Sequence, residues 1–364
     1  MRFADIVTDV EKRIGNTSIS TVVKQWVNQA QDEIQAFFNH PFLITEGFLQ
    51  TVDDYSTGTA GVTNGSSAIT GAATVWASTM IGRKIRIVSD NEWYTIIAVG
   101  GVGAITLDRN YEGTTDATAN YVIYQDTYRV LADVNRMKLI RNLGQSLTLQ
   151  YANTTEFDMA IPSVTNESSP RVAIIKGRDN TEYATGTVSG ATNTITGAGT
   201  SWTSVQGLSK GNKIQVGNYS YTIKSVDSAL QVTTYETLAE TVALGTSYKI
   251  QLNNMLVQLY PPPAESIGMP YKYYRTMKPL VNNADESEVP EKYHRLLVEG
   301  ACKRAFIFSY NAEKFNLAKS EFNEGLLLMK KDYDLTSDRV NVMRSDTSSR
   351  KKDIYSIPRN FGTL

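Results

Sequence analysis

The chain has 364 residues, of which 41% are hydrophobic and 20% are charged, so its composition is that of an ordinary folded protein. The formal net charge of −1 argues against a protein whose main task is to grip a nucleic-acid backbone, because such proteins usually carry a basic surplus. The sequence contains no run of about 18 apolar residues, which argues against a membrane-spanning helix.

Two helices are predicted within residues 3–39. The first covers about Ala4–Arg13 and ends at Gly15-Asn16, a favourable left-handed stop. Thr17, Ser18 or Ser20 can cap the second helix. Apolar residues recur in this second helix at helical spacing and predict one buried face, formed by Val23, Trp26, Val27, Ala30, Ile34 and Phe37.

Two segments of similar sequence follow, Thr57–Tyr124 and Thr185–Leu252. Both open with Thr-Gly-Thr and then share Ile-Thr-Gly-Ala, Thr-x-Trp, Lys-Ile, Tyr-Thr-Ile and Tyr-x-Ile in the same order, which indicates an internal repeat. Each copy predicts a small all-β sandwich or barrel, and Gly217-Asn218 indicates a two-residue hairpin turn. The equivalent residues Trp76 and Trp202 are expected in the two cores; the alternative is a sugar-stacking surface.

Without the two copies, the chain predicts one α+β core. Its strands are expected at Phe42–Val52, Tyr128–Arg141 (a strand–turn–strand), Ser146–Gln150, Arg171–Gly177, Met255–Tyr260 and Tyr271–Arg275. Met255–Tyr260 is the natural partner of Arg171–Gly177, and Pro261-Pro262-Pro263 ends it because proline cannot donate to a ladder. Thr155–Asp158 matches a capping box and predicts a short helical turn that Pro162 ends.

Two more helices are predicted near the C-terminus. Pro290 suits the first turn of one, and the acids that precede it, Asp285, Glu286 and Glu288, suit the positive end of a helix. The apolar stripe of this helix is formed by Leu297, Ala301, Ala305 and Phe308. The next helix, Ala312–Asp332, has a stripe of the same spacing, formed by Phe315, Ala318, Phe322, Leu326 and Met329.

These patterns predict an α+β fold in which a helical core with antiparallel strands carries two inserted small all-β repeat domains and an extended C-terminal arm. The core is assigned to residues 1–52, 128–184 and 253–335, the β insertions to 53–127 and 185–252, and the arm to 336–364. Insertions of this size are tolerated best in surface loops. Within the arm, Ser337–Leu364 lacks periodicity and is expected to be disordered alone or ordered on a partner.

The sequence offers no constellation for catalysis. Its two histidines, His40 and His294, are far apart without ligand spacing, so no metal site is predicted, and each is expected to be a structural or interface residue. Cys302 is the only cysteine and is expected to be a packed hydrophobe rather than a nucleophile. We therefore predict no catalytic residues, no cofactor and no enzyme; a hydrolase hidden in the β copies ranks lowest among the alternatives.

The core resembles the head–tail adaptor (connector or head-completion) proteins of tailed bacteriophages. The stretches that carry the resemblance are Val23–Ala30, Tyr128–Val134, Thr155–Asp158, Leu259–Pro263, Tyr273–Arg275, Glu288–His294 and the helix Leu296–Ala301 with Gly-Ala in its middle. The resemblance covers the core, roughly half of the chain, and lies in the order of these stretches rather than in one specific motif. The two β copies are not part of a minimal adaptor.

The resemblance implies a virion protein of the neck, assembled in the host cytoplasm, that forms a ring commonly of twelve copies. Such a ring joins the portal to the tail or nozzle protein and lines a conduit for DNA ejection, through which DNA passes without sequence-specific binding and without any membrane. The C-terminal segment would reach the portal through its basic residues, Arg339, Arg344, Arg350, Lys351, Lys352 and Arg359. The alternative hypothesis is a surface or glycan-binding module built on the β repeats.

Overall fold

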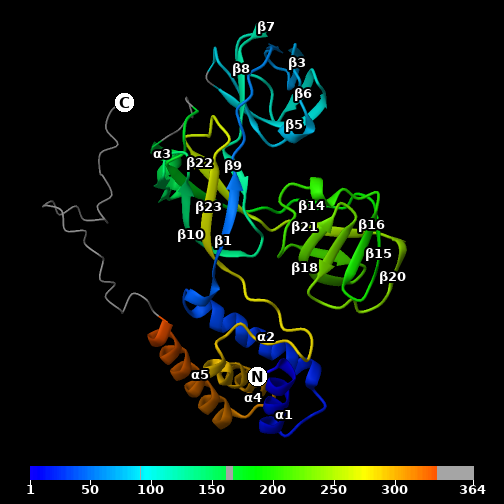
Figure 1. Cartoon of the computed structure of the whole chain (residues 1–364), viewed down its shortest axis with the longest axis vertical. Helices are drawn as coiled ribbons and strands as arrows, with labels where there is room; N and C mark the ends of the chain where they lie inside the picture. Colours follow the sequence, from blue (N-terminus) through cyan, green and yellow to red (C-terminus); the bar gives the residue numbers. More distant parts are fainter. Residues whose placement is uncertain (91, 161–166, 334–364) are drawn as a thin grey trace, which may run out of the picture.

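The computed structural model describes residues 1–90, 92–160 and 167–333. Figure 1 shows helices at one end of the molecule, a central group of strands, a β unit at the opposite end and a further β unit beside the centre. Both ends of the described chain contribute to the helical part: two helices precede the strands in sequence and two follow them. The fold class is therefore α+β with mainly antiparallel sheets, as the sequence predicts.

Four helices form what we call the helical unit. They are α1 (Phe3–Ile14), α2 (Ser20–Phe37), α4 (His294–Phe308) and α5 (Ala312–Tyr333). Gly15 ends α1 with a φ of 75°, which confirms the predicted left-handed stop. The helices share one apolar core, and the stripe predicted for α5 forms part of it, with Ala318, Phe322, Leu326 and Met329 all buried.

Three details of the helical unit differ from the sequence predictions. Ser20 is the first residue of α2 rather than its cap, and the capping position, Ile19, provides no side-chain bond. Helix α4 begins at His294, after a 3₁₀ turn at Glu291–Tyr293, so the preceding acids do not lie in its first turn. Glu288 pairs instead with Arg275 at 2.5 Å.

The apolar faces also end earlier than their spacing predicts. Phe37 and Phe308 are the last residues of α2 and α4, and both are exposed. The rest of each stripe is buried or half-buried, and the ring of half-buried Trp26 lies 5.7 Å from that of Phe308. A residue at a helix end has no following turn to cover it, which explains why periodicity alone fails there.

Two four-stranded sheets form what we call the central β body. One has the order β1-β23-β10-β11 and the other β12-β13-β22-β9. The strands are β1 (Ile44–Gln50), β9 (Thr127–Arg129), β10 (Val134–Asn142), β11 (Leu147–Thr148), β12 (Gln150–Ala152), β13 (Val172–Arg178), β22 (Met255–Tyr260) and β23 (Gly268–Arg275). Strand β1 follows a 3₁₀ turn at Pro41–Leu43. The inner faces of the two sheets share a core that includes Met137, Val257, Leu259, Met269 and Tyr271.

The pairing predicted between Arg171–Gly177 and Met255–Tyr260 is confirmed, because β13 and β22 are antiparallel neighbours with Ala173 opposite Leu259. The short helix α3 (Thr154–Ala160) is also present. Its cap is Asn153, whose side-chain oxygen accepts a hydrogen bond from the amide of Thr155, so the predicted capping box is wrong. Pro162, predicted to end this helix, lies outside the described residues.

The first β unit is a seven-stranded sheet with the order β7-β2-β3-β6-β5-β4-β8. Its strands are β2 (Thr59–Val62), β3 (Ala68–Ala72), β4 (Lys84–Ile87), β5 (Trp93–Gly101), β6 (Ala104–Leu107), β7 (Asp116–Ala119) and β8 (Tyr121–Tyr124), with a 3₁₀ turn at Ser78–Met80. At its end, Tyr55 forms an isolated bridge to Ile123.

The second β unit is an eight-stranded sheet with the order β14-β21-β17-β18-β19-β16-β15-β20. Its strands are β14 (Glu182–Tyr183), β15 (Thr187–Ala191), β16 (Thr194–Ala198), β17 (Lys213–Val216), β18 (Tyr219–Ser228), β19 (Gln231–Thr234), β20 (Val242–Thr246) and β21 (Tyr248–Gln251), with a 3₁₀ turn at Trp202–Ser204. Read from β20, this order matches that of the first unit strand by strand, and β14 stands where Tyr55 forms its bridge. The Gly217-Asn218 turn is confirmed, because Val216 pairs with Tyr219.

Candidate interaction surfaces

The residues predicted to contact the portal lie outside the described part of the chain. They are Arg339, Arg344, Arg350, Lys351, Lys352 and Arg359. Their role stays a prediction from the resemblance.

The two histidines are both held by backbone or terminal groups. Nε2 of His40 donates to the carbonyl of Ile34 at 2.6 Å, and burial lowers the pKa of this imidazole. Nε2 of His294 donates to the carbonyl of Val289 at 2.7 Å, while Nδ1 accepts from the amino group of Met1 at 2.8 Å. These hydrogen bonds fix the orientation of each imidazole ring, and the two side chains do not contact each other.

Cys302 is buried in the core of the helical unit. Burial raises the pKa of its thiol to about 12, so the reactive thiolate is scarce near neutral pH.

Each of the two equivalent tryptophans is buried and hydrogen-bonded. Nε1 of Trp76 donates to the hydroxyl of Tyr121 at 3.1 Å, and that of Trp202 donates to Tyr248 at 3.0 Å. Each tyrosine hydroxyl then donates to a carbonyl at the start of its unit, that of Thr57 or that of Thr185. Burial raises the pKa of both tyrosines to about 12. With exposed fractions of 2% and 1%, neither indole offers a face for a sugar ring.

The end of α4 and the turn that follows it present apolar side chains to solvent. Ile307, Phe308 and Tyr310 are 58%, 64% and 96% exposed, and we call this set the apolar turn. Tyr310 also has a φ of 53°, an unusual backbone conformation for a tyrosine. Large apolar side chains that gather on a surface mark interaction sites more often than singly scattered ones do. The sequence places Phe308 at the end of a stripe but gives no signal that it is exposed.

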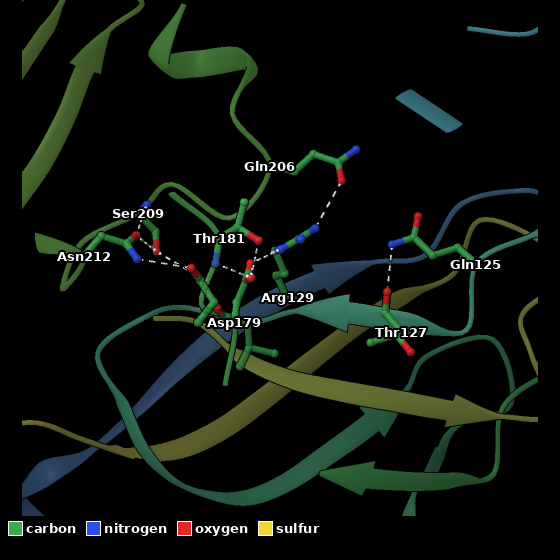
Figure 2. Close-up of polar contacts among 10 residues, drawn as sticks. Gln125, Thr127, Arg129, Asp179, Thr181, Gln206, Ser209 and Asn212 are labelled. Atoms are coloured by element: carbon green, nitrogen blue, oxygen red, sulfur yellow. Dashed lines mark hydrogen bonds and ion pairs between the residues drawn. The ribbon is translucent and has the colours of Figure 1, made fainter. Parts of the chain in front are cut away.

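A polar junction joins the second β unit to the central β body, and Figure 2 shows it. Nε of Arg129 on β9 lies 2.5 Å from a carboxylate oxygen of Asp179, which follows β13. The other oxygen of Asp179 accepts from both the amide and the hydroxyl of Thr181. Burial alone would raise the pKa of Asp179, but the bonds from Thr181 and Arg129 outweigh it and lower the pKa.

Two buried asparagines complete this junction. Asn212, before β17, donates to the side-chain oxygen of Asn254 at 3.2 Å. Asn254 donates in turn to the carbonyl of Val130 at 2.7 Å, in the segment that follows β9. Because buried polar groups that lose their partners are costly, this network ties the second β unit to one position on the central β body.

The first β unit contacts the central β body through charged pairs. Nζ of Lys84 lies 3.0 Å from the carboxylate of Asp126, which also accepts from the amide of Gln258 on β22. Arg86 and Glu167 form a largely buried ion pair at 2.9 Å. The two units therefore share a strand order, and both attachments include ion pairs, since Lys210 of the second unit lies 3.3 Å from Asp133. The second attachment adds the buried asparagines.

Residues 1–90, 92–160 and 167–333 hold neither a metal-ligand cluster nor a membrane-spanning helix. Within them, no group of three or more His, Cys, Asp or Glu side chains could hold a metal ion. No helix in that part of the chain combines the length and apolarity that crossing a bilayer requires.

Comparison with known proteins gives one finding that bears on function. Residues 214–346 match the protein-family model of the SU10 adaptor protein. The match covers less than half of the chain; it begins in β17 and includes β22, β23, α4 and α5 with the apolar turn. No curated protein matches the chain. The SU10 adaptor match supports an adaptor-like structural protein of a phage, and thus a virion component.

Proposed function

We propose that the chain is a ring-forming head-to-tail adaptor that joins the portal of a phage to its tail. The observation that carries this proposal is the SU10 adaptor match, because it spans the strands and helices that also carry much of the resemblance to connector proteins. In this function the protein binds and positions its neighbours and is not an enzyme. It sits in the virion neck, and DNA passes through the ring without sequence-specific contacts. The near-neutral net charge of the chain is consistent with a conduit to which DNA does not adhere.

The apolar turn is the surface that best fits a contact between neighbouring copies. A ring requires a heterologous interface, in which one patch of each copy meets a different patch of the next. Phe308 and Tyr310 are the aromatic anchors that such interfaces favour, and both lie in the matched region. Their exposure in the single chain leaves apolar surface that a neighbouring copy would cover.

The two β units would be insertions in the adaptor core. The second unit enters after β13 and leaves into β22, and these two strands are antiparallel neighbours. The first unit leaves into β9, which pairs with β22. The first unit follows β1, which lies in the other sheet, so it connects the two sheets of the central β body, whereas the second connects two neighbouring strands of one sheet. Both would then be insertions between strands of the central β body. The boundaries 53–127 and 185–252 stay a prediction.

The experiment that tests the proposed function is the mass of the assembled protein in solution, with variants of the apolar turn. The double change Phe308→Ser and Tyr310→Ser should convert a ring into smaller species while leaving each chain folded, because both side chains are exposed. The matched control, Tyr219→Ser, removes an exposed tyrosine of the second β unit and should leave the ring intact. A truncation after Leu335 tests the arm separately: it should form the ring but lose binding to a portal.

A double variant that assembles like the unchanged chain would remove the apolar turn from the interface. A truncated chain that still binds the portal would contradict the role proposed for Arg339, Arg344, Arg350, Lys351, Lys352 and Arg359.

A further inference from the structure

Strand β10 of the central β body has a free edge. One side of β10 pairs with β23 from Val134 to Ile140. The other side pairs with β11 only at Arg141 and Asn142. Between residues 135 and 139, the described part of the chain places no strand on this side. A free strand edge presents unpaired amides and carbonyls, which another extended segment can bind.

Both ends of this edge are closed by bonds from the protein itself. At one end, the guanidinium of Arg178 on β13 donates to the carbonyl of Val134 at 2.6 Å. At the other end, the amide of Leu149 donates to the carbonyl of Ile140 at 2.9 Å. The open stretch therefore has defined limits, which a short strand would fit.

A pocket lies beside the free edge. It has a volume of about 490 Å³ and is lined by Arg136 and Met137 of β10, by residues 151–154 and by Ile175 of β13. Met137 is buried, while Tyr151 and Ile175 are partly exposed, and these three side chains give the pocket an apolar side. It lies where the two sheets end, because β12 closes one of them and β11 the other.

The outward face of β10 is basic. Arg136, Lys138 and Arg141 are exposed, whereas Met137 and Ile140 point to the core. Within the described residues, these three side chains form no ion pair: Arg136 donates to the side chain of Asn39, and Lys138 lies over the ring of Tyr274. The acids nearest in sequence to the pocket are Glu156 and Asp158 on α3, so the basic groups on and beside this edge outnumber them.

We propose that the free edge of β10 and its pocket bind an extended, acidic segment of a partner protein, added as one more strand. Side chains of a strand alternate between its two faces. One set would then lie beside Arg136 and Lys138, where carboxylates are favoured, and the other set would enter the apolar pocket. The sequence of the segment would alternate acidic and apolar residues.

Two other occupants fit less well. The chain's own Ser337–Leu364 segment carries six basic residues against three aspartates, so it would be repelled by this face. Double-stranded DNA would match the charge of β10, but it has no use for a free strand edge or an apolar pocket. The proposal does not depend on ring formation, since a monomer would present the same edge.

The test is binding of a short peptide that alternates glutamate and valine to the full-length chain, measured by fluorescence anisotropy. The double charge reversal Arg136→Glu and Lys138→Glu should weaken binding by about tenfold or more, because two attractions become repulsions. The control Lys319→Glu with Lys330→Glu makes the same net charge change on the exposed face of α5 and should leave binding unchanged.

Three further probes separate strand addition from simple charge attraction. A peptide with lysine in place of glutamate should not bind. A glutamate–valine peptide methylated on alternate backbone nitrogens should also lose binding, because it cannot complete the ladder. The proposal is overturned if the methylated peptide binds as well as the original, or if the original does not bind at all. Binding of duplex DNA instead, lost on the same double reversal, would assign the face to nucleic acid.

Discussion

At the scale of single residues, the two Trp–Tyr pairs are the clearest case of what the sequence predicts. Repeat alignment and the size of the side chain together indicate that Trp76 and Trp202 are buried, and both are. The partner of each indole could not be predicted, because Tyr121 and Tyr248 lie 45 and 46 residues further along the chain. Only the fold of each β unit brings the two rings of a pair to 5.8 Å between their centres.

The hydroxyl of Tyr248 should therefore contribute measurably to the stability of the second β unit. Tyr248→Phe leaves the buried indole N–H of Trp202 and the carbonyl of Thr185 without their partner, at a cost of about 1–3 kcal/mol. Hydrogen exchange of the amides in β17 to β21 would measure this loss. Tyr219→Phe is the control, since Tyr219 is exposed; equal exchange in both variants would refute the role of the hydroxyl.

At the scale of elements, periodic patterns predict well which face of a helix is buried, but they predict poorly where the helix begins and ends. The stripe of α5 is buried except for half-buried Phe315, because its members pack into the core that the four helices share. Caps and ends depend on one or two local bonds, which a pattern does not reveal: the capping box predicts Thr155 as the cap of α3, whereas the cap is Asn153. The exposed turn after α4 could not be predicted for the same reason.

Gly300 in the middle of α4 should not tolerate a larger side chain. A Cβ at this position would lie 2.6 Å from Cβ of Ala30 on α2 and 2.9 Å from the ring of Phe322 on α5. Gly300→Ala is expected to destabilise the helical unit by about 1–3 kcal/mol through overpacking. The higher helix propensity of alanine offsets part of this cost. Urea unfolding followed by circular dichroism at a helical wavelength would measure it. Asn316→Ala, on the exposed face of α5, should instead be neutral or stabilising; a stable Gly300→Ala protein would contradict this packing.

The polar junction should depend on the charge of Asp179. Asp179→Asn keeps the shape but removes the ion pair with Arg129, and we expect faster hydrogen exchange around Thr181 near neutral pH. Because the folded pKa of Asp179 is lowered, the stabilisation is present above the ordinary value of 3.8 and is lost as the pH falls through the folded pKa. The difference between the two proteins should therefore vanish in strong acid.

The control for this prediction is Glu182→Gln. It also changes a carboxylate to an amide, but the pair of Glu182 with Lys249 is exposed at both ends, so it should change little. A difference between Asp179→Asn and the unchanged protein that persists unaltered into strong acid would contradict the assignment.

At the scale of the whole molecule, the sequence predicts the repeat and the fold class but not how the parts fit together. The junction at Asn212 and Asn254 and the free edge of β10 both arise from contacts between segments far apart in the chain. Asparagines and short strands carry no periodic signal, so neither feature could be predicted. The resemblance to phage connectors and the SU10 adaptor match agree on an adaptor role.

We propose that copies of this chain assemble into a ring that docks on a portal. The most direct test is the mass of the full-length protein by light scattering, alone and after mixing with purified portal rings. We predict a closed assembly of many 40.3 kDa chains in at least the mixture, with a single defined mass. A protein that keeps the mass of one chain both alone and with the portal would contradict the account.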